Sequence, residues 1–313
     1  MRMPPSWKGR VRVPVIAAPM FLVSNPKLAA ACCKAGVVGT FPALNQRSTE
    51  AFVAWLDEMK ASLTDADAPF GVNLIVHKTN PRLQADLTEV VKHKVPLVIT
   101  SLGAVAEVVD AVHSYGGIVF HDIINVRHAE KAAKAGVDGL IPVAAGAGGH
   151  AGTISPFALV PEVRAMFDGY IALSGCIGTG AGVAAALALG ADFAYMGTRF
   201  IATQEAAVSD AYKQMVVDST AADIVYTPHI SGVAANFLRP SIVRAGLDPE
   251  RLQPKTDIDF GTELSGGKAW KDIWSAGQGS GAIHDVPPAA ELCERLIREF
   301  RETCRGLALA SAA

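Results

Sequence analysis

The stretch Ala29-Ala-Ala-Cys-Cys-Lys-Ala-Gly-Val-Val-Gly-Thr40 has two weak copies further along the chain. Residues 129–140 read Ala-Glu-Lys-Ala-Ala-Lys-Ala-Gly-Val-Asp-Gly-Leu, and residues 183–194 read Val-Ala-Ala-Ala-Leu-Ala-Leu-Gly-Ala-Asp-Phe-Ala. In each copy an alanine-rich, helix-forming segment ends at a glycine, and a short apolar segment follows. The glycines are Gly36, Gly136 and Gly190. The repeat therefore predicts a helix, a tight turn and a buried strand, which together make half of a β-α-β unit.

Short apolar segments alternate with helix-like segments over the first 200 residues of the chain. The expected strands are Val13–Ala18, Val37–Phe41, Pro69–Leu74, Leu97–Ser101, Ile118–His121, Gly139–Val143, Tyr170–Leu173 and Phe193–Met196. The expected helices are Pro26–Ala35, Thr49–Leu63, Pro81–His93, Ala104–Ser114, Val126–Ala135, Ala158–Phe167 and Thr179–Leu189. Eight strands in this alternation predict an α/β fold of the closed (β/α)8 type, the TIM barrel.

The alternation stops after the eighth expected strand. Residues 206–285 mix helical stretches with glycine-rich segments such as Gly261–Gly267, so we expect an inserted, substrate-side lobe beside the barrel mouth. Residues 1–205 and 286–313 would then form the barrel. Apolar residues at Leu292, Leu296, Ile297 and Phe300 have helical spacing, which predicts that the chain returns as the eighth barrel helix before fraying at its end.

Composition excludes several classes of partner. The 313 residues carry a formal net charge of −2 and no basic cluster, which argues against nucleic acid and anionic membranes. No run of 18 apolar residues and no signal-peptide pattern occur, so we expect a cytoplasmic protein. The five cysteines and the scattered histidines lack zinc-ligand spacing, so no metal site is expected. The remaining candidate partner is a small molecule.

Two glycine-containing loops follow the seventh and eighth expected strands. The first is Leu173-Ser-Gly-Cys-Ile-Gly-Thr-Gly180, and the second is Met196-Gly-Thr-Arg-Phe200. These are the positions at which (β/α)8 barrels bind phosphate. Glycines there expose backbone N–H groups, helix starts add unpaired donors, and the hydroxyls of Ser174 and Thr198 can contribute. The pair of loops predicts a phosphate-bearing cofactor.

A histidine lies in the glycine-rich loop after the sixth expected strand, Ala144-Ala-Gly-Ala-Gly-Gly-His150-Ala-Gly-Thr-Ile-Ser155. With few bulky neighbours to pack against, His150 is the candidate catalytic residue, able to take or donate a proton. At the end of the fifth strand, His121 and Asp122 form a second candidate pair. Asp122 could contact substrate or orient a histidine, or it could cap the helix that begins near Asn125.

The ends of the first and third strands carry the remaining candidates. The segment after the first strand, Ala17-Ala-Pro-Met-Phe21, is apolar and could lie against the flat face of an aromatic cofactor or could be ordinary loop packing. Asn73 is a polar residue on an otherwise apolar strand. Its amide could hydrogen-bond to a ring carbonyl or a ring nitrogen.

Taken in order, these motifs resemble the nitronate monooxygenases, also called 2-nitropropane dioxygenases, which are FMN-dependent barrels. The matching pieces are Ala18-Pro-Met20, Gly71-Val-Asn-Leu74, Ala147-Gly-Gly-His-Ala-Gly152, Ala185–Asp192, Met196–Phe200 and Trp274-Ser-Ala-Gly-Gln-Gly279. The resemblance implies FMN as cofactor and His150 as the histidine near its reactive nitrogen. It implies a cofactor site formed by Ala18, Pro19, Met20, Asn73, Gly148, Gly149, Ser174, Gly175, Cys176, Met196, Gly197, Thr198 and Gln278, with Phe21, His121 and Asp122 on the substrate side.

Three functions remain as hypotheses. The first is oxidation of alkyl nitronates with O2. The second keeps the flavin but uses NAD(P)H to reduce a quinone or an enoyl thioester. The third is a flavin-free barrel that binds a phosphorylated metabolite. The sequence leaves the oligomeric state open, with a homodimer as one option.

Overall fold

The computed structural model describes residues 2–103, 105–253 and 272–310. Eight parallel strands close into a barrel in the order β1-β2-β3-β4-β5-β6-β8-β9, and β9 pairs with β1 to complete the ring. The strands are β1 (Val15–Ala17), β2 (Val38–Pro42), β3 (Phe70–Ile75), β4 (Leu97–Ser101), β5 (Ile118–Ile123), β6 (Gly139–Pro142), β8 (Tyr170–Ser174) and β9 (Phe193–Met196). This confirms the predicted (β/α)8 fold, and every expected strand is present with its ends shifted by a residue or two at most.

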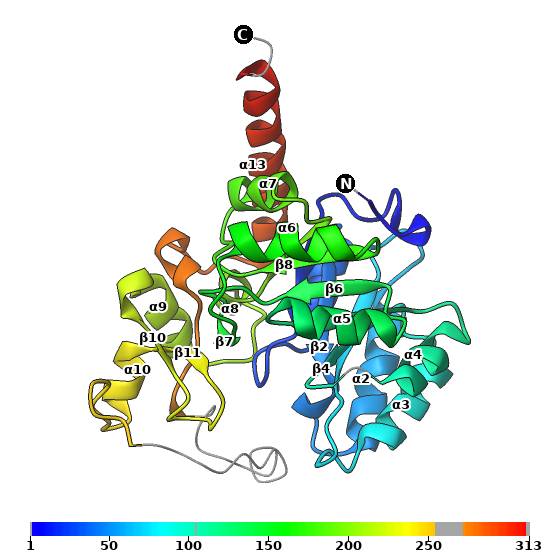
Figure 1. Cartoon of the computed structure of the whole chain (residues 1–313), viewed down its shortest axis with the longest axis horizontal. Helices are drawn as coiled ribbons and strands as arrows, with labels where there is room; N and C mark the ends of the chain where they lie inside the picture. Colours follow the sequence, from blue (N-terminus) through cyan, green and yellow to red (C-terminus); the bar gives the residue numbers. More distant parts are fainter. Residues whose placement is uncertain (1, 104, 254–271, 311–313) are drawn as a thin grey trace.

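Helices cover the outside of the barrel (Figure 1). They are α1 (Pro26–Lys34), α2 (Thr49–Ser62), α3 (Leu83–Lys92), α4 (Ala106–His113), α5 (Val126–Lys134), α6 (Pro156–Met166), α7 (Gly180–Ala188) and α13 (Ala289–Ala310). The last of these packs against α7 and α1, so the chain does return as the eighth barrel helix. The expected fraying does not begin at residue 308, because α13 continues to Ala310 and projects beyond the barrel.

Local capping explains where these helices begin. Asn25 and Asn125 accept backbone hydrogen bonds at the starts of α1 and α5, as expected for residues of their type. The expected start of α6 at Ala158 was two residues late. Ser155 caps that helix by accepting from the N–H of Phe157, and Pro156 fills the first helical position, where its missing N–H costs nothing.

The end of the barrel at which the strands begin is closed by aromatic packing. Trp7, from the N-terminal segment, is buried against Phe193 at a ring-centroid distance of 5.4 Å and against Phe120 at 6.3 Å. Buried rings of this size contribute large apolar areas to the core. With this end filled, the space for a ligand is at the opposite end, where the strands terminate.

Gly39 provides a stability test of the repeat. A Cβ built on this β2 residue would lie 2.1 Å from the backbone oxygen of Ala29 in α1, so helix and strand touch only because neither position carries bulk. We expect Gly39→Ala to destabilise the protein by ~2 kcal/mol or more, because neither backbone can easily shift. Thermal unfolding followed by circular dichroism measures this. Gly306→Ala on α13, where a Cβ meets nothing, is the control and should be neutral or slightly stabilising. An equal melting temperature for wild type and Gly39→Ala would contradict the packing.

A smaller unit lies on one side of the barrel, around β7 (Figure 1). It contains α9 (Asp210–Asp218), β10 (Ile224–Thr227), β11 (Ala235–Leu238) and α10 (Arg239–Arg244), and it follows the short helix α8 (Thr198–Ile201). Strands β10, β11 and β7 (Gly149–His150) form an antiparallel sheet, in which His150 pairs with Ala235. The segment Gly261–Gly267, expected to be part of the lobe, lies outside the described residues. No described helix is long and apolar enough to cross a membrane.

Candidate functional site

A cavity of about 1070 Å³ opens at the carboxyl ends of the barrel strands. It is lined by fifteen of the residues singled out in the sequence, namely Ala18, Pro19, Met20, Phe21, Asn73, His121, Asp122, Gly148, Gly149, His150, Ser174, Gly175, Cys176, Gly197 and Thr198. Met196 and Gln278 are not among the residues that line it. Met196 is buried and its backbone oxygen accepts from the N–H of Ala18, whereas the N–H of Gln278 donates to the backbone oxygen of Gly146 at 2.8 Å.

One wall of the cavity is the apolar loop after β1. Pro19, Met20, Phe21 and Leu22 all line it, and Leu22 has a left-handed backbone with φ of 60°. The hydroxyl of Ser24 accepts from the N–H of Met20 at 2.9 Å, which fixes the turn. An apolar wall without charge suits the face of an aromatic ring.

Glycines let three further loops approach one another beside this wall. A Cβ on Gly146 would lie 2.4 Å from Cys176 Sγ, and a Cβ on Gly277 would lie 2.6 Å from the backbone oxygen of Gly146. Gly175 has φ of +131°, a conformation that side chains rarely adopt, and Cys176 follows it with φ of 58°. The loops after β6 and β8 and the segment before α13 therefore form one tightly packed cradle.

Two of the backbone N–H groups at the start of α7, which the sequence suggested as phosphate donors, are already paired within the protein. Thr179 caps this helix by accepting from the N–H of Gly182, and the carboxylate of Glu299 on α13 accepts from the N–H of Gly180 at 2.8 Å. An anionic side chain already sits at this helix end, where the helix dipole favours negative charge. The preceding loop, 174–178, in contrast, borders the cavity through Ser174, Gly175, Cys176 and Ile177.

Thr198 begins α8 beside the same cradle. Its hydroxyl oxygen accepts from the N–H of Gly277 at 2.8 Å, so the side chain holds the segment before α13 in place. A hydroxyl that accepts one hydrogen bond can still donate its own hydrogen. Thr198 can therefore both support the cradle and contact a ligand.

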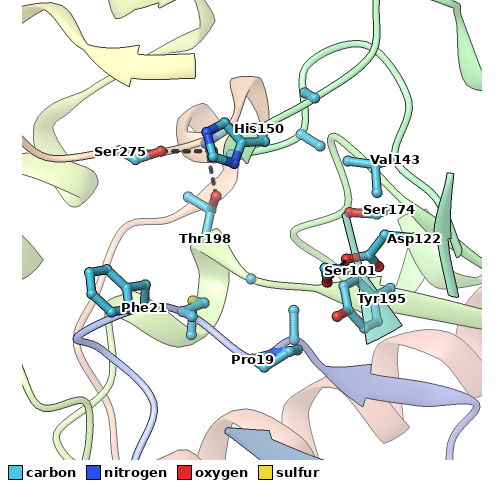
Figure 2. Close-up of a pocket in the computed structure, with 18 of the residues that line it drawn as sticks. Pro19, Phe21, Ser101, Asp122, Val143, His150, Ser174, Tyr195, Thr198 and Ser275 are labelled. Carbon is cyan, nitrogen blue, oxygen red and sulfur yellow. Dashed lines mark hydrogen bonds between the residues drawn. The ribbon is translucent and has the colours of Figure 1, made fainter. Parts of the chain in front are cut away.

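The loop that carries His150 is held by the smaller unit. Ser275 Oγ accepts from the N–H of Gly149 at 2.7 Å and donates to the backbone oxygen of Asn236 at 2.5 Å. The amide of Asn236 in turn donates to the backbone oxygen of Ala147 at 2.6 Å. Both contacts hold backbone atoms of the segment just before the histidine, and the β7–β11 pairing reinforces them. His150 is thus on a fixed loop, beside Thr198 and Ser275 (Figure 2).

The imidazole of His150 is neutral over the physiological range. Burial lowers its pKa from 6.5 to about 4, because the charged form loses hydration in this cavity. His121 has the same property, its pKa also being lowered by burial to about 4, while its Nδ1 lies 2.7 Å from the hydroxyl of Thr100. A neutral imidazole can accept a proton but brings no positive charge to a ligand.

Asn73 is oriented by its own strand neighbours. Its side-chain nitrogen donates to the backbone oxygen of Ile99 at 3.1 Å and to the hydroxyl of Ser101 at 2.8 Å. Both amide hydrogens are therefore used within the protein, and the carbonyl oxygen is what Asn73 can present to a ligand. This orientation favours a ring N–H over a ring carbonyl as its partner.

Asp122 continues this chain of hydrogen bonds. Ser101 Oγ, which accepts from Asn73, donates to Asp122 Oδ2 at 2.6 Å. The other oxygen, Oδ1, is buried and has no hydrogen-bond partner among the described residues. Burial raises the pKa of Asp122 from 3.8 to about 6, although the bond from Ser101 acts in the opposite direction. Asp122 does not cap α5, whose cap is Asn125.

Two of the lining residues next to Asp122 were missed in the sequence. Ser101 and Tyr195 lie beside it in Figure 2, on the opposite side of the cavity from His150. Burial raises the pKa of Tyr195 well above 10, so its hydroxyl stays neutral. Ser101 could have been identified as Asn73 was, because it too is a polar residue near the end of an apolar strand. Two further lining residues are Ser275 and Tyr212, whose hydroxyl donates to the backbone oxygen of Ser275 at 2.5 Å. They could not be found this way, because their packing depends on the smaller unit.

A (β/α)8 barrel with a large cavity at its strand ends, a buried neutral histidine beside it and a glycine cradle is the arrangement of an enzyme active site. The nitronate monooxygenase family model matches residues 6–299. The chain belongs to this family, a flavin-dependent group, and is an oxidoreductase.

Individual relatives agree with this assignment. The nitronate monooxygenase of Paraburkholderia phytofirmans is 28% identical, over 94% of each chain. The nitroalkane oxidase of Streptomyces ansochromogenes superposes with a TM-score of 0.82 at 25% identity and covers 96% of this chain and 99% of its own. FabK from Thermotoga maritima superposes with a TM-score of 0.80 at 26% identity, covering 95% and 96%.

Proposed function

We propose that the protein binds FMN and oxidises alkyl nitronates with O2. The observation that carries this proposal is the joint geometry of the cavity: a flat apolar wall, an oriented amide acceptor and a glycine cradle surround one space, with His150 at its edge. The family assignment supports the nitronate substrate, since relatives that share nearly the whole chain bear that name.

The residues present fit FMN on three counts. The cavity is large enough for a drug-sized ligand with a small substrate beside it. Met20 and its neighbours would lie against the ring, and the Asn73 carbonyl oxygen would accept from a ring N–H. Loop 174–178 together with Thr198 would hold the phosphate, because Gly175 and Cys176 adopt conformations that turn the backbone sharply there. When bound, the flavin supplies the electron-accepting chemistry that no side chain has.

The chain's own contribution to turnover would be proton handling and positioning. His150, neutral above pH 4, would hydrogen-bond to the substrate, and because a nitronate has already lost the proton next to its nitrogen, any proton that the imidazole accepts would come from a later step of turnover. Ser275 and Asn236 would keep its loop in one position, so that the imidazole does not have to be ordered during each turnover. We propose on this basis that residues 206–285 form a substrate-side lobe of a barrel made by 1–205 and 286–313.

We also propose that the enzyme works in a reducing, cytoplasmic compartment. All five cysteines are free thiols, and three of them, Cys32, Cys33 and Cys293, are buried near one another without forming a disulfide. Proteins of oxidising compartments more often use such pairs as disulfides.

Oxygen uptake tests the proposed reaction. Protein reconstituted with FMN is mixed with propyl-2-nitronate under air, and in parallel with NADH or NADPH plus a quinone or an enoyl thioester. We expect nitronate-dependent oxygen uptake and little consumption of reduced nicotinamide. Consumption of NADH with such an acceptor, with no nitronate turnover, would instead establish a reductase. A protein that takes up no FMN would be a flavin-free phosphate-binding barrel.

A further inference from the structure

We propose that Asp122 binds substrate as a neutral carboxylic acid, with Oδ1 donating a hydrogen bond to an oxygen of the anionic substrate. This inference rests on the proposed nitronate substrate and adds a recognition group on the side of the cavity opposite His150 (Figure 2). A nitronate carries its negative charge on two oxygens, so it needs donors in a cavity whose imidazoles are neutral.

The hydrogen-bond chain determines which oxygen carries the proton. Asn73 donates to Ser101, Ser101 donates to Asp122 Oδ2, and so Oδ2 is already an acceptor. A neutral acid in this arrangement carries its hydrogen on Oδ1, the atom that has no partner among the described residues. Asp122 borders the cavity, so a bound ligand is what can satisfy that hydrogen.

The surroundings favour the neutral form. The described titratable groups that border the same cavity are His121, His128, Lys131, His150, Cys176, Tyr195, Arg199, Tyr212 and Tyr226. Burial lowers the pKa values of the three histidines and raises those of Cys176 and Tyr195, which in each case favours the neutral form. Arg199 pairs with Asp285 at 2.6 Å, Lys131 is exposed at the rim, and no salt bridge within the described residues includes Asp122.

Substrate binding also favours the neutral form of Asp122. A negative charge near Asp122, and the loss of water from the cavity, both disfavour an ionised carboxyl and raise its pKa further. The acid would therefore be protonated in the complex at a pH where the free enzyme is partly ionised. An anion and a carboxylate would repel each other, so ionisation of Asp122 should weaken binding instead of promoting it.

Asp122→Asn is the sharpest variant, because an asparagine can reproduce the protonated acid. Its carbonyl oxygen can accept from Ser101 while its NH2 group takes the place of Oδ1–H. In wild type, kcat/KM for propyl-2-nitronate should fall tenfold per pH unit above about 6, whereas the variant should lack this limb. The ratio of variant to wild-type kcat/KM should thus rise about 50-fold between pH 6 and pH 8, because half of Asp122 is already ionised at pH 6. Substrate ionisation is common to both proteins and cancels in the ratio.

Two further variants separate donation from packing. Asp122→Ala removes both hydrogen and charge and should raise KM by about 10- to 100-fold below pH 6, as expected for a lost bond to a charged group. The difference from wild type should shrink above pH 6, where wild-type Asp122 is itself ionised. Ser101→Ala removes the bond that favours the ionised acid, so the alkaline limb should move to higher pH. A flavin-loaded Asp122→Asn enzyme that is inactive at all pH values would overturn the proposal, because it would mean that the carboxylate acts as a base. An unchanged alkaline limb in this variant would also overturn it.

A measurement without turnover keeps this test independent of the proposed function. Infrared difference spectra of the FMN-loaded protein should show a protonated carboxyl band that disappears above pH 6 and is missing in Asp122→Asn. Binding of isobutyrate, an unreactive anion of similar shape, can be followed by flavin absorbance and should weaken over the same range in wild type only. If nitronate is not oxidised but both signals occur, the proposed function fails and the role of Asp122 stands. Absence of the carboxyl band overturns the role of Asp122.

Discussion

Replacing His150 with alanine is expected to leave a protein that still binds flavin but turns over about 10²- to 10⁴-fold more slowly, the range that proton-transfer groups usually contribute. The imidazole borders the cavity, and the close contacts that form the glycine cradle are made by Gly146, Cys176 and Gly277. The loop is held through backbone atoms of Gly149 and Ala147, so its position should survive the substitution. Flavin content and kcat, measured on the same preparation, check the retained flavin binding and the slowed turnover.

The pH profile adds a second readout for His150. Because its pKa is lowered, the imidazole is neutral above about 4 and charged below it, so a step that needs the neutral form is lost only as pH falls through 4. The acid limb of kcat should lie near pH 4 in wild type and be missing in the variant. His113→Ala, at an exposed histidine that pairs with Asp138 on the far side of the barrel, is the matched control and should keep full activity. Undiminished turnover in His150→Ala would remove this residue from the mechanism.

Replacing Gly175 with valine is expected to raise the dissociation constant for FMN by at least ~10-fold. Two effects add here. A residue with a side chain is strained at φ of +131°, at a cost of roughly 1–3 kcal/mol, and its Cβ would lie 3.2 Å from the backbone oxygen of Ala145. Relief of that contact must displace loop 174–178 or its neighbour, both of which line the cavity. Titration of the flavin-free protein with FMN, followed by fluorescence, measures the loss.

The matched control for Gly175 is Gly116, which also has a left-handed backbone, with φ of +82°, but meets nothing within 4 Å and lies at the opposite end of the barrel. Gly116→Val carries comparable strain and should bind FMN as wild type does. Gly175→Ala is the milder companion if the valine variant folds poorly, and it should show a smaller loss in the same direction. Full FMN occupancy in both Gly175 variants would mean that the phosphate binds elsewhere.

Most of the barrel could be predicted because its signals are local. An alanine-rich helix end, a glycine and an apolar strand recur at Gly36, Gly136 and Gly190, and all three glycines have positive φ in the structure. The Trp7 plug was not predicted, because a single tryptophan in a polar segment has no periodicity to indicate its partners. Its burial against Phe120 and Phe193 depends on closure of the whole barrel.

The site was predictable where it follows strand ends and unpredictable where side chains cross between units. Asn73, Asp122 and His150 could be placed because the carboxyl ends of barrel strands converge. The hydrogen bond from the N–H of Gly180, at the start of α7, to Glu299 could not be predicted. The two residues are far apart in sequence and meet only because α13 packs on α7. The bonds of the Ser275 hydroxyl to Gly149 and Asn236 were unpredictable for the same reason.

Anaerobic reduction of the bound flavin tests the central claim most directly. The FMN-loaded protein, free of oxygen, is mixed in separate experiments with propyl-2-nitronate, NADH and NADPH, and the visible absorbance of the flavin is recorded. The nitronate should bleach the flavin at a rate at least as fast as steady-state turnover, and His150→Ala should be bleached far more slowly. Rapid bleaching by NADH or NADPH, with none by the nitronate, would contradict the account and make the protein a nicotinamide-dependent reductase.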